Sequence, residues 1–171
     1  MVSLLQRILA PRTEPDAPTL LYQAIVAQAR SPHWYVEGAV PDTMDGRFDM
    51  LSSILALVLL RLEAIDARLE TARLAELFVT DMDGQLRQGG VGDLVVGKHI
   101  GRMMSLLGGR LDAYRAGLEP GGDLAGAIDR NIHRGASVAD GGRNHVEQGL
   151  RALAEGLARR PLDIILAGEI A

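Results

Sequence analysis

The stretch Met50-Leu-Ser-Ser-Ile-Leu-Ala-Leu-Val-Leu-Leu-Arg-Leu62 decides the fold of this chain of 171 residues. Apolar side chains occupy nearly every position, so a helix formed from it is apolar on almost all sides. Such a helix must be covered by other elements, because an exposed side would leave a costly apolar patch. We therefore predict a central buried helix that starts after an N-cap at Asp45 and runs from Arg47 to about Leu69.

The segments around this helix repeat apolar residues at helical spacing, and none alternates as a strand does. We expect irregular connections at 31–46 and 88–97, and a tail at 161–171 that packs back or stays loose. The predicted fold is all-α, a single compact domain of five to seven helices without a significant sheet. The further helices are expected at 2–10, from an N-cap at Thr19 to about Arg30, and at 71–87, 98–118, 123–133 and 144–159.

The chain divides into three parts by composition. Residues 1–18 form an expected short helix and linker, 19–118 the helical core, and 119–171 a C-terminal helical extension packed on that core. The division near residue 118 follows a change in composition, since no aromatic residue occurs in 115–171.

Composition and charge exclude several classes of function. With 18 basic and 22 acidic residues the net charge is −4, and the arginines are scattered, which does not favour direct binding of nucleic acid. The absence of cysteine excludes disulfides, thiol nucleophiles and thiolate–zinc sites. The longest apolar run, 54–60, is far shorter than the ~20 residues of a membrane span.

Residues 77–84, Leu-Phe-Val-Thr-Asp-Met-Asp-Gly, are the one stretch that imitates a catalytic motif. In haloacid-dehalogenase-type hydrolases such a motif ends a strand, with one aspartate as nucleophile and the other as general acid. The flanks here are helical, so a hydrolase using Asp81 and Asp83 is kept only as the alternative. The four histidines lack metal-ligand spacing, and the glycines at 89–92 lack the context of a phosphate loop. No cofactor is predicted.

Three motifs follow one another with a specific spacing. The first comprises Trp34-Tyr35 and residues 40–48, the second 78–83, 86–87 and 90–94, and the third 96–98 and 109–114. Together they resemble the ubiquinol–cytochrome c chaperones, a family that includes the mitochondrial cytochrome b assembly factor and alphaproteobacterial relatives. The resemblance covers about residues 19–118.

The resemblance implies an all-helical chaperone without catalytic activity that helps newly made cytochrome b enter the ubiquinol–cytochrome c reductase complex. Its implied partners are cytochrome b and either the ribosome or a second chaperone subunit. The expected location is cytoplasmic, or peripheral at the inner membrane. The candidate partner-binding or structural residues are Trp34, Tyr35, Asp42, Arg47, Asp81, Asp83, Arg87, Asp93, Lys98, Arg110 and Tyr114.

Two more expectations concern helix surfaces. Asp81 falls beside an apolar stripe, where an unpaired carboxylate is costly, so we predict an ion pair with Arg110 or Lys98. Three methionines at helical spacing are predicted to pack in the core, with an adaptable client surface as the alternative use. They are Met82, Met103 and Met104.

Overall fold

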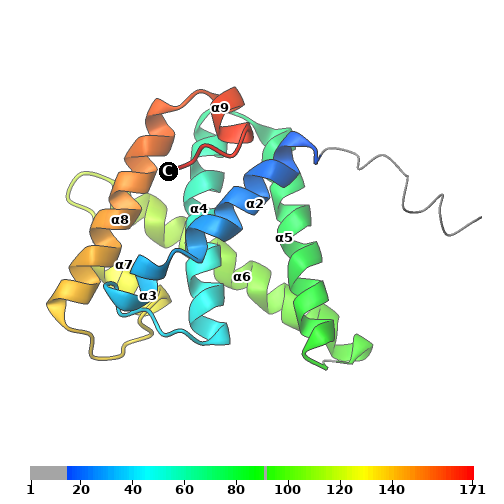
Figure 1. The fold of residues 1–171 in the computed structure, drawn as a ribbon, viewed down its shortest axis with the longest axis horizontal. Coiled ribbons are helices and arrows are strands. Elements are labelled where there is room, and N and C mark those ends of the chain that lie inside the picture. Colours follow the sequence, from blue (N-terminus) through cyan, green and yellow to red (C-terminus); the bar gives the residue numbers. More distant parts are fainter. Residues whose placement is uncertain (1–14, 91) are drawn as a thin grey trace, which may run out of the picture.

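The computed structural model describes residues 15–90 and 92–171, without the side chains of Asp93 and Leu94 (Figure 1). The described part contains helices and no strand, which confirms the all-α prediction. The helix predicted at 2–10 lies outside the described residues. The helices are α2 (Ala17–Ala29), α3 (Pro32–Val36), α4 (Met44–Ala64), α5 (Arg68–Gln88), α6 (Asp93–Leu118), α7 (Leu124–Asn131), α8 (Asp140–Arg159) and α9 (Leu162–Leu166).

Helix α4 occupies the centre of the fold, as its sequence predicts. Every side chain from Asp49 to Leu59 is buried. Helices α2, α5, α6 and α8 all pack against it, and Figure 1 shows α4 in the middle of the molecule with α2 crossing it. These four helices therefore cover the apolar surface of α4.

Most of the observed helix starts differ from the predicted ones. Helix α5 begins at Arg68 rather than at residue 71, and α8 begins at Asp140 rather than at residue 144. Asp16, not Thr19, caps α2, because its carboxylate accepts the backbone N–H of Thr19 at 3.1 Å. Thr43, not Asp45, caps α4 by accepting the N–H of Gly46 at 3.1 Å. Helix α6 begins at Asp93, so Lys98 lies in its second turn rather than at its start.

The ends of the helices and their connections also differ from the predictions. The connection predicted at 88–97 is shortened to 89–92, because α5 ends at Gln88 and α6 begins at Asp93. Helix α4 ends at Ala64 rather than Leu69, because Asp66 adopts a positive φ of 57° that breaks the helix before α5. The long connection at 31–46 contains the short helix α3, whose Trp34 is buried. The indole packs against α8 at Gly149. A Cβ added to this glycine would lie only 2.6 Å from the ring, so a larger residue would clash there.

Residues after 118 share the core with the rest of the chain. Helix α8 packs on α4 and α7, and α7 packs on α6. The tail folds back, since α9 contacts α2 and buries Ile165. The boundary at residue 118 stays a prediction. None of the described helices combines the length and apolarity that crossing a bilayer requires.

Candidate partner-binding site

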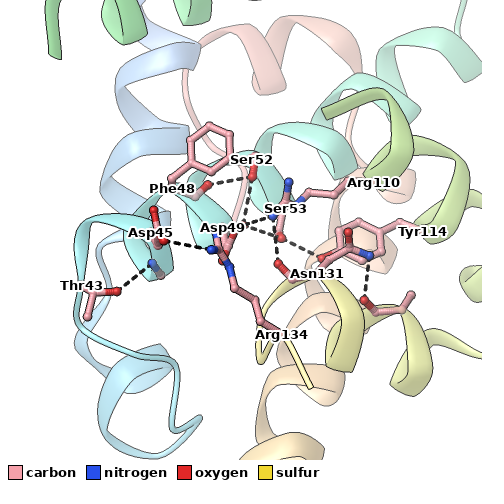
Figure 2. Close-up of polar contacts among 12 residues, drawn as sticks. Thr43, Asp45, Phe48, Asp49, Ser52, Ser53, Arg110, Tyr114, Asn131 and Arg134 are labelled. Carbon is pink, nitrogen blue, oxygen red and sulfur yellow. Dashed lines mark hydrogen bonds and ion pairs between the residues drawn. The ribbon is translucent and has the colours of Figure 1, made fainter. Parts of the chain in front are cut away.

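A fully buried carboxylate, Asp49 on α4, holds three parts of the fold together (Figure 2). Arg134, which follows α7, donates from Nε to Oδ2 at 2.6 Å and from Nη2 to Oδ1 at 3.1 Å. Arg110 on α6 donates from Nη2 to Oδ1 of the same carboxylate. Asp49 thus ties α6 and the segment after α7 to the first half of α4.

Arg110 is the buried cation that faces Asp49, with only 3% of its side chain exposed. Its Nη2 also donates to the carbonyl of Asn131 at 2.9 Å, and its guanidinium lies 5.5 Å from the centroid of the Phe48 ring. Burial lowers the pKa of Arg110, and the charge of Asp49 opposes that shift. A buried cation of this kind depends on the carboxylate that faces it.

Arg134 reaches Asp49 from an unusual backbone conformation. Its φ of 53° lies in the left-handed region, which non-glycine residues seldom adopt. From there Nη1 also donates to Asp45 at 2.9 Å, while hydrogen bonding to Asp49 raises the pKa of the Arg134 guanidinium. The side chain therefore closes the cluster at the edge where α4 begins.

One turn beyond Asp49, Ser53 on α4 and Tyr114 on α6 share a hydrogen bond of 2.7 Å. Both side chains are fully buried, and burial raises the pKa of Tyr114 to about 12. This contact continues the tie between α4 and α6 that the Asp49–Arg110 pair begins (Figure 2).

An open groove of about 450 Å³ lies beside the cluster, between the start of α4, the end of α5 and the first half of α6. Phe48 belongs to its wall and also faces Arg110, so the groove borders the buried cluster directly. The wall is formed mainly by apolar side chains with three methionines, and it comprises Met44, Asp45, Phe48, Met82, Gln85, Leu86, Gly89, His99, Arg102, Met103, Leu106 and Arg134. Such a surface can accept apolar side chains of varied shape.

A second, smaller recess of about 140 Å³ adjoins the groove on the α2 side. The two share Met44, Phe48, Met82 and Gln85 in their walls. The accessible surface therefore extends around Met44 from α6 to α2.

Several predicted site residues form local pairs on the surface. Asp42 and Arg47 form an ion pair of 2.7 Å, as do Asp83 and Arg87 within α5. Lys98 is exposed on α6. The side chain of Asp93 is outside the described part.

Trp34 and Tyr35 support the fold from α3 by hydrogen bonds to the end of α2. The indole Nε1 donates to the carbonyl of Gln28 at 2.9 Å, and the Tyr35 hydroxyl donates to that of Ala29 at 2.8 Å. Trp34 is 1% exposed, so it covers the core.

The predicted ion pair of Asp81 with Arg110 or Lys98 is wrong. Asp81 accepts hydrogen bonds from the Tyr22 hydroxyl at 2.8 Å and from Gln85 Nε2 at 3.0 Å, while Arg110 turns to Asp49. The half-buried carboxylate is satisfied by neutral donors, one from α2 and one from the next turn of α5.

The three methionines all pack in or against the core, as predicted; their alternative use as a client surface stays a prediction. Met82 is 3% exposed and Met103 is half-buried, and both also line the groove. Met104 is half-buried and packs against the core.

Asp49 and Arg134, which form the centre of the cluster together with Arg110, were not among the predicted site residues. Asp49 carries a signal, since a carboxylate directly before the apolar stretch 50–62 has to be buried and needs a cation. Arg134 carries none, because it lies in a turn where no periodicity indicates its direction.

These features describe an all-helical domain with an apolar groove beside a buried charge cluster. The sequence model of the family described as ubiquinol-cytochrome C chaperone matches residues 37–170. This chain therefore belongs to the ubiquinol–cytochrome c chaperone family. The match includes the extension after residue 118, which the resemblance of the three motifs did not reach.

A solved structure agrees with this assignment. The chain is similar to the crystal structure of the Cbp3 homolog from Brucella abortus, with 30% sequence identity and a TM-score of 0.77. The similarity covers 91% of this chain and 87% of that one. No curated protein matches the sequence.

Proposed function

We propose that this protein is a non-enzymatic assembly chaperone that binds newly made cytochrome b and supports assembly of the ubiquinol–cytochrome c reductase complex. The family match over residues 37–170 carries the proposal, and the similarity to the Cbp3 homolog supports it. The ribosome or a second chaperone subunit is a proposed further partner, and the proposed location is the cytoplasm or the periphery of the inner membrane.

The groove is consistent with a membrane-protein client. A membrane protein presents apolar helices before it is inserted or assembled, and a chaperone must cover them reversibly. Met44 and Met103 in the groove wall supply flexible, polarisable side chains that adapt to such surfaces.

The alternative hydrolase finds no support in the fold. Asp81 and Asp83 lie in the second half of helix α5 instead of at the end of a strand. Their carboxylates are engaged by Tyr22 and Gln85 and by Arg87, respectively.

Deletion of the gene tests the proposed function in a strain without a second family member. We expect membranes of the deletion strain to lose most of their cytochrome b, measured by immunoblot and by the haem b absorbance, and to regain it with the plasmid-borne gene. The double variant Asp81→Asn/Asp83→Asn should restore cytochrome b as the wild type does. Normal cytochrome b in the deletion strain would contradict the chaperone role, and failure of a well-folded double variant would favour the hydrolase.

A further inference from the structure

The groove between α4, α5 and α6 leaves apolar side chains in contact with solvent. Met44 is 76% exposed and Leu106 is 41% exposed, and both line the groove. Val95 adds a further exposed apolar side chain at the start of α6, 45% accessible. Apolar side chains gathered at one recess of a folded protein indicate a surface that another molecule covers.

The shape of this surface fits a helix. Its walls are themselves helices, because the lining side chains come mainly from the end of α5, the first half of α6 and the start of α4. A recess between helices receives the apolar ridge of another helix, whereas a lipid surface is flat and leaves a recess unfilled. The shared wall around Met44 would let a helix continue into the adjoining recess toward α2.

The charge beside the groove selects among such helices. Arg102 lines the groove and Lys98 lies one turn earlier on α6, both exposed, and no acidic side chain of the described residues pairs with either. Two cations four residues apart on a helix repel one another. By contrast, Asp45, which also lines the groove, is already held by Arg134. Among the described side chains at this edge of the groove, the uncompensated charge is therefore positive.

We propose that this groove binds an apolar helix carrying a carboxylate at the edge of its apolar face, and that cytochrome b supplies this helix. The carboxylate would lie beside Arg102 and Lys98, while the apolar ridge covers Met44, Phe48 and Leu106. The assignment of this helix to cytochrome b rests on the proposed function. The inference that the groove binds an apolar helix with a carboxylate rests only on the residues of the groove.

Two amphipathic peptides of about 20 residues test the groove, a length that permits a helix to form. They are identical except for one residue at the edge of the apolar face, glutamate in one and lysine in the other. We expect the full-length wild type to bind the glutamate peptide about fivefold more tightly, the size of effect that one exposed charge pair produces. Arg102→Glu should reverse this preference, and Arg68→Glu, at the far end of α5, should leave it unchanged.

The apolar wall is tested with exposed positions, so that each variant can still fold. Met44→Glu and Leu106→Glu should weaken binding of both peptides at least about tenfold, the effect of losing one buried apolar side chain. Leu69→Glu is the matched control, because Leu69 is 79% exposed and lies about 25 Å along α5 from Leu86. Circular dichroism melts verify that all variants are folded.

The outcomes separate this inference from the proposed function. Equal binding by wild type, Met44→Glu and Leu106→Glu would overturn the groove as a helix site. Binding of vesicles containing anionic phosphatidylglycerol, lost in Arg102→Glu and without peptide binding, would overturn it in favour of a lipid contact. Capture of cytochrome b from membranes, reduced in the groove variants only, supports the full proposal. Peptide binding without any cytochrome b capture would overturn cytochrome b as the occupant and leave the helix site standing.

Discussion

Asp49 is the residue on which the packing around α4 depends most. Its carboxylate faces two guanidinium groups, and Arg110 is almost completely buried. Removing one partner of a buried pair leaves the other charge without compensation, while the pair as a whole adds little over apolar packing. The cluster therefore fixes how α6 and the segment after α7 sit on α4 more than it adds net stability.

Replacement of Asp49 by alanine should lower the free energy of unfolding by about 3–5 kcal/mol, because Arg110 is left buried and unpaired. Asp83→Ala removes an exposed ion pair and should cost less than about 1 kcal/mol. Urea denaturation measures both. The double variant Asp49→Leu/Arg110→Met should recover part of the loss, and equal stability of Asp49→Ala and wild type would contradict the role given to this pair.

The buried Tyr114 makes the stability of the folded protein depend on pH in the alkaline range. Its pKa is raised by burial to about 12 in the folded protein, against about 10 in an unfolded chain. Between these values the folded state keeps the phenolic proton and the unfolded state loses it, so stability is fully present below pH 10 and falls as pH rises. The expected loss is about 2–3 kcal/mol between about pH 10 and pH 12.

Comparison with Tyr114→Phe isolates this effect, because phenylalanine does not ionise and the other tyrosines remain. We expect the wild type to lose more stability than the variant over this range in thermal melts. Parallel loss in both proteins would show that Tyr114 does not titrate as its burial requires.

At the scale of elements, the start of α4 depends on close packing between the first turn of the helix and the turn that precedes it. A Cβ on Gly46 would lie 1.9 Å from the carbonyl oxygen of Pro41, so only glycine permits the turn at 41–43 to pack on the helix. The same turn brings Thr43 to its capping position and leaves Asp45 directed at Arg134.

Two glycine-to-alanine changes should act in opposite directions. Gly46→Ala should destabilise the fold by about 1–3 kcal/mol, because the added methyl group forces the turn away from α4. Gly84→Ala, within α5 and with no atom near its added Cβ, should stabilise it by about 0.5–1 kcal/mol through helix propensity. Chemical denaturation compares them, and a neutral Gly46→Ala would refute the close contact at Pro41.

At the scale of the whole molecule, the C-terminal extension supplies part of the hydrophobic core around α4. Four apolar side chains of α8 are buried there: Val146, Leu150, Leu153 and Leu157. Burial of each contributes about 1.5–3 kcal/mol, so their sum approaches the total stability of a typical domain. The parts at 19–118 and 119–171 therefore depend on each other.

A fragment ending at residue 118 should fail to fold cooperatively, since its loss of α8 exposes one side of α4. Circular dichroism and thermal melting of the fragment check this expectation, with the full chain measured under the same conditions. A cooperative melt of the fragment would instead establish residues 19–118 as an independent domain.

The sequence by itself determined the class of the fold, its central helix and the family. A helix that is apolar on every side, as residues 50–62 form, is favourable only in the interior of the fold. The helical spacing of apolar residues can be recognised within a short stretch of sequence, so it predicts the other helices as well. The capping residues were displaced by two or three positions because Asp16 and Thr43 compete with Thr19 and Asp45 for the same role. Local sequence does not decide which of two good capping residues is used.

Only the tertiary structure decided which charges meet. Arg110 pairs with Asp49, which is 61 residues away, and Tyr22 reaches Asp81 from 59 residues away. Which side chains meet across two helices depends on their crossing angle and rotation, and these are set by the packing of the whole core. Residues 50–62 indicate that α4 must be covered, but the ion pairs follow from which helices cover it and where they cross.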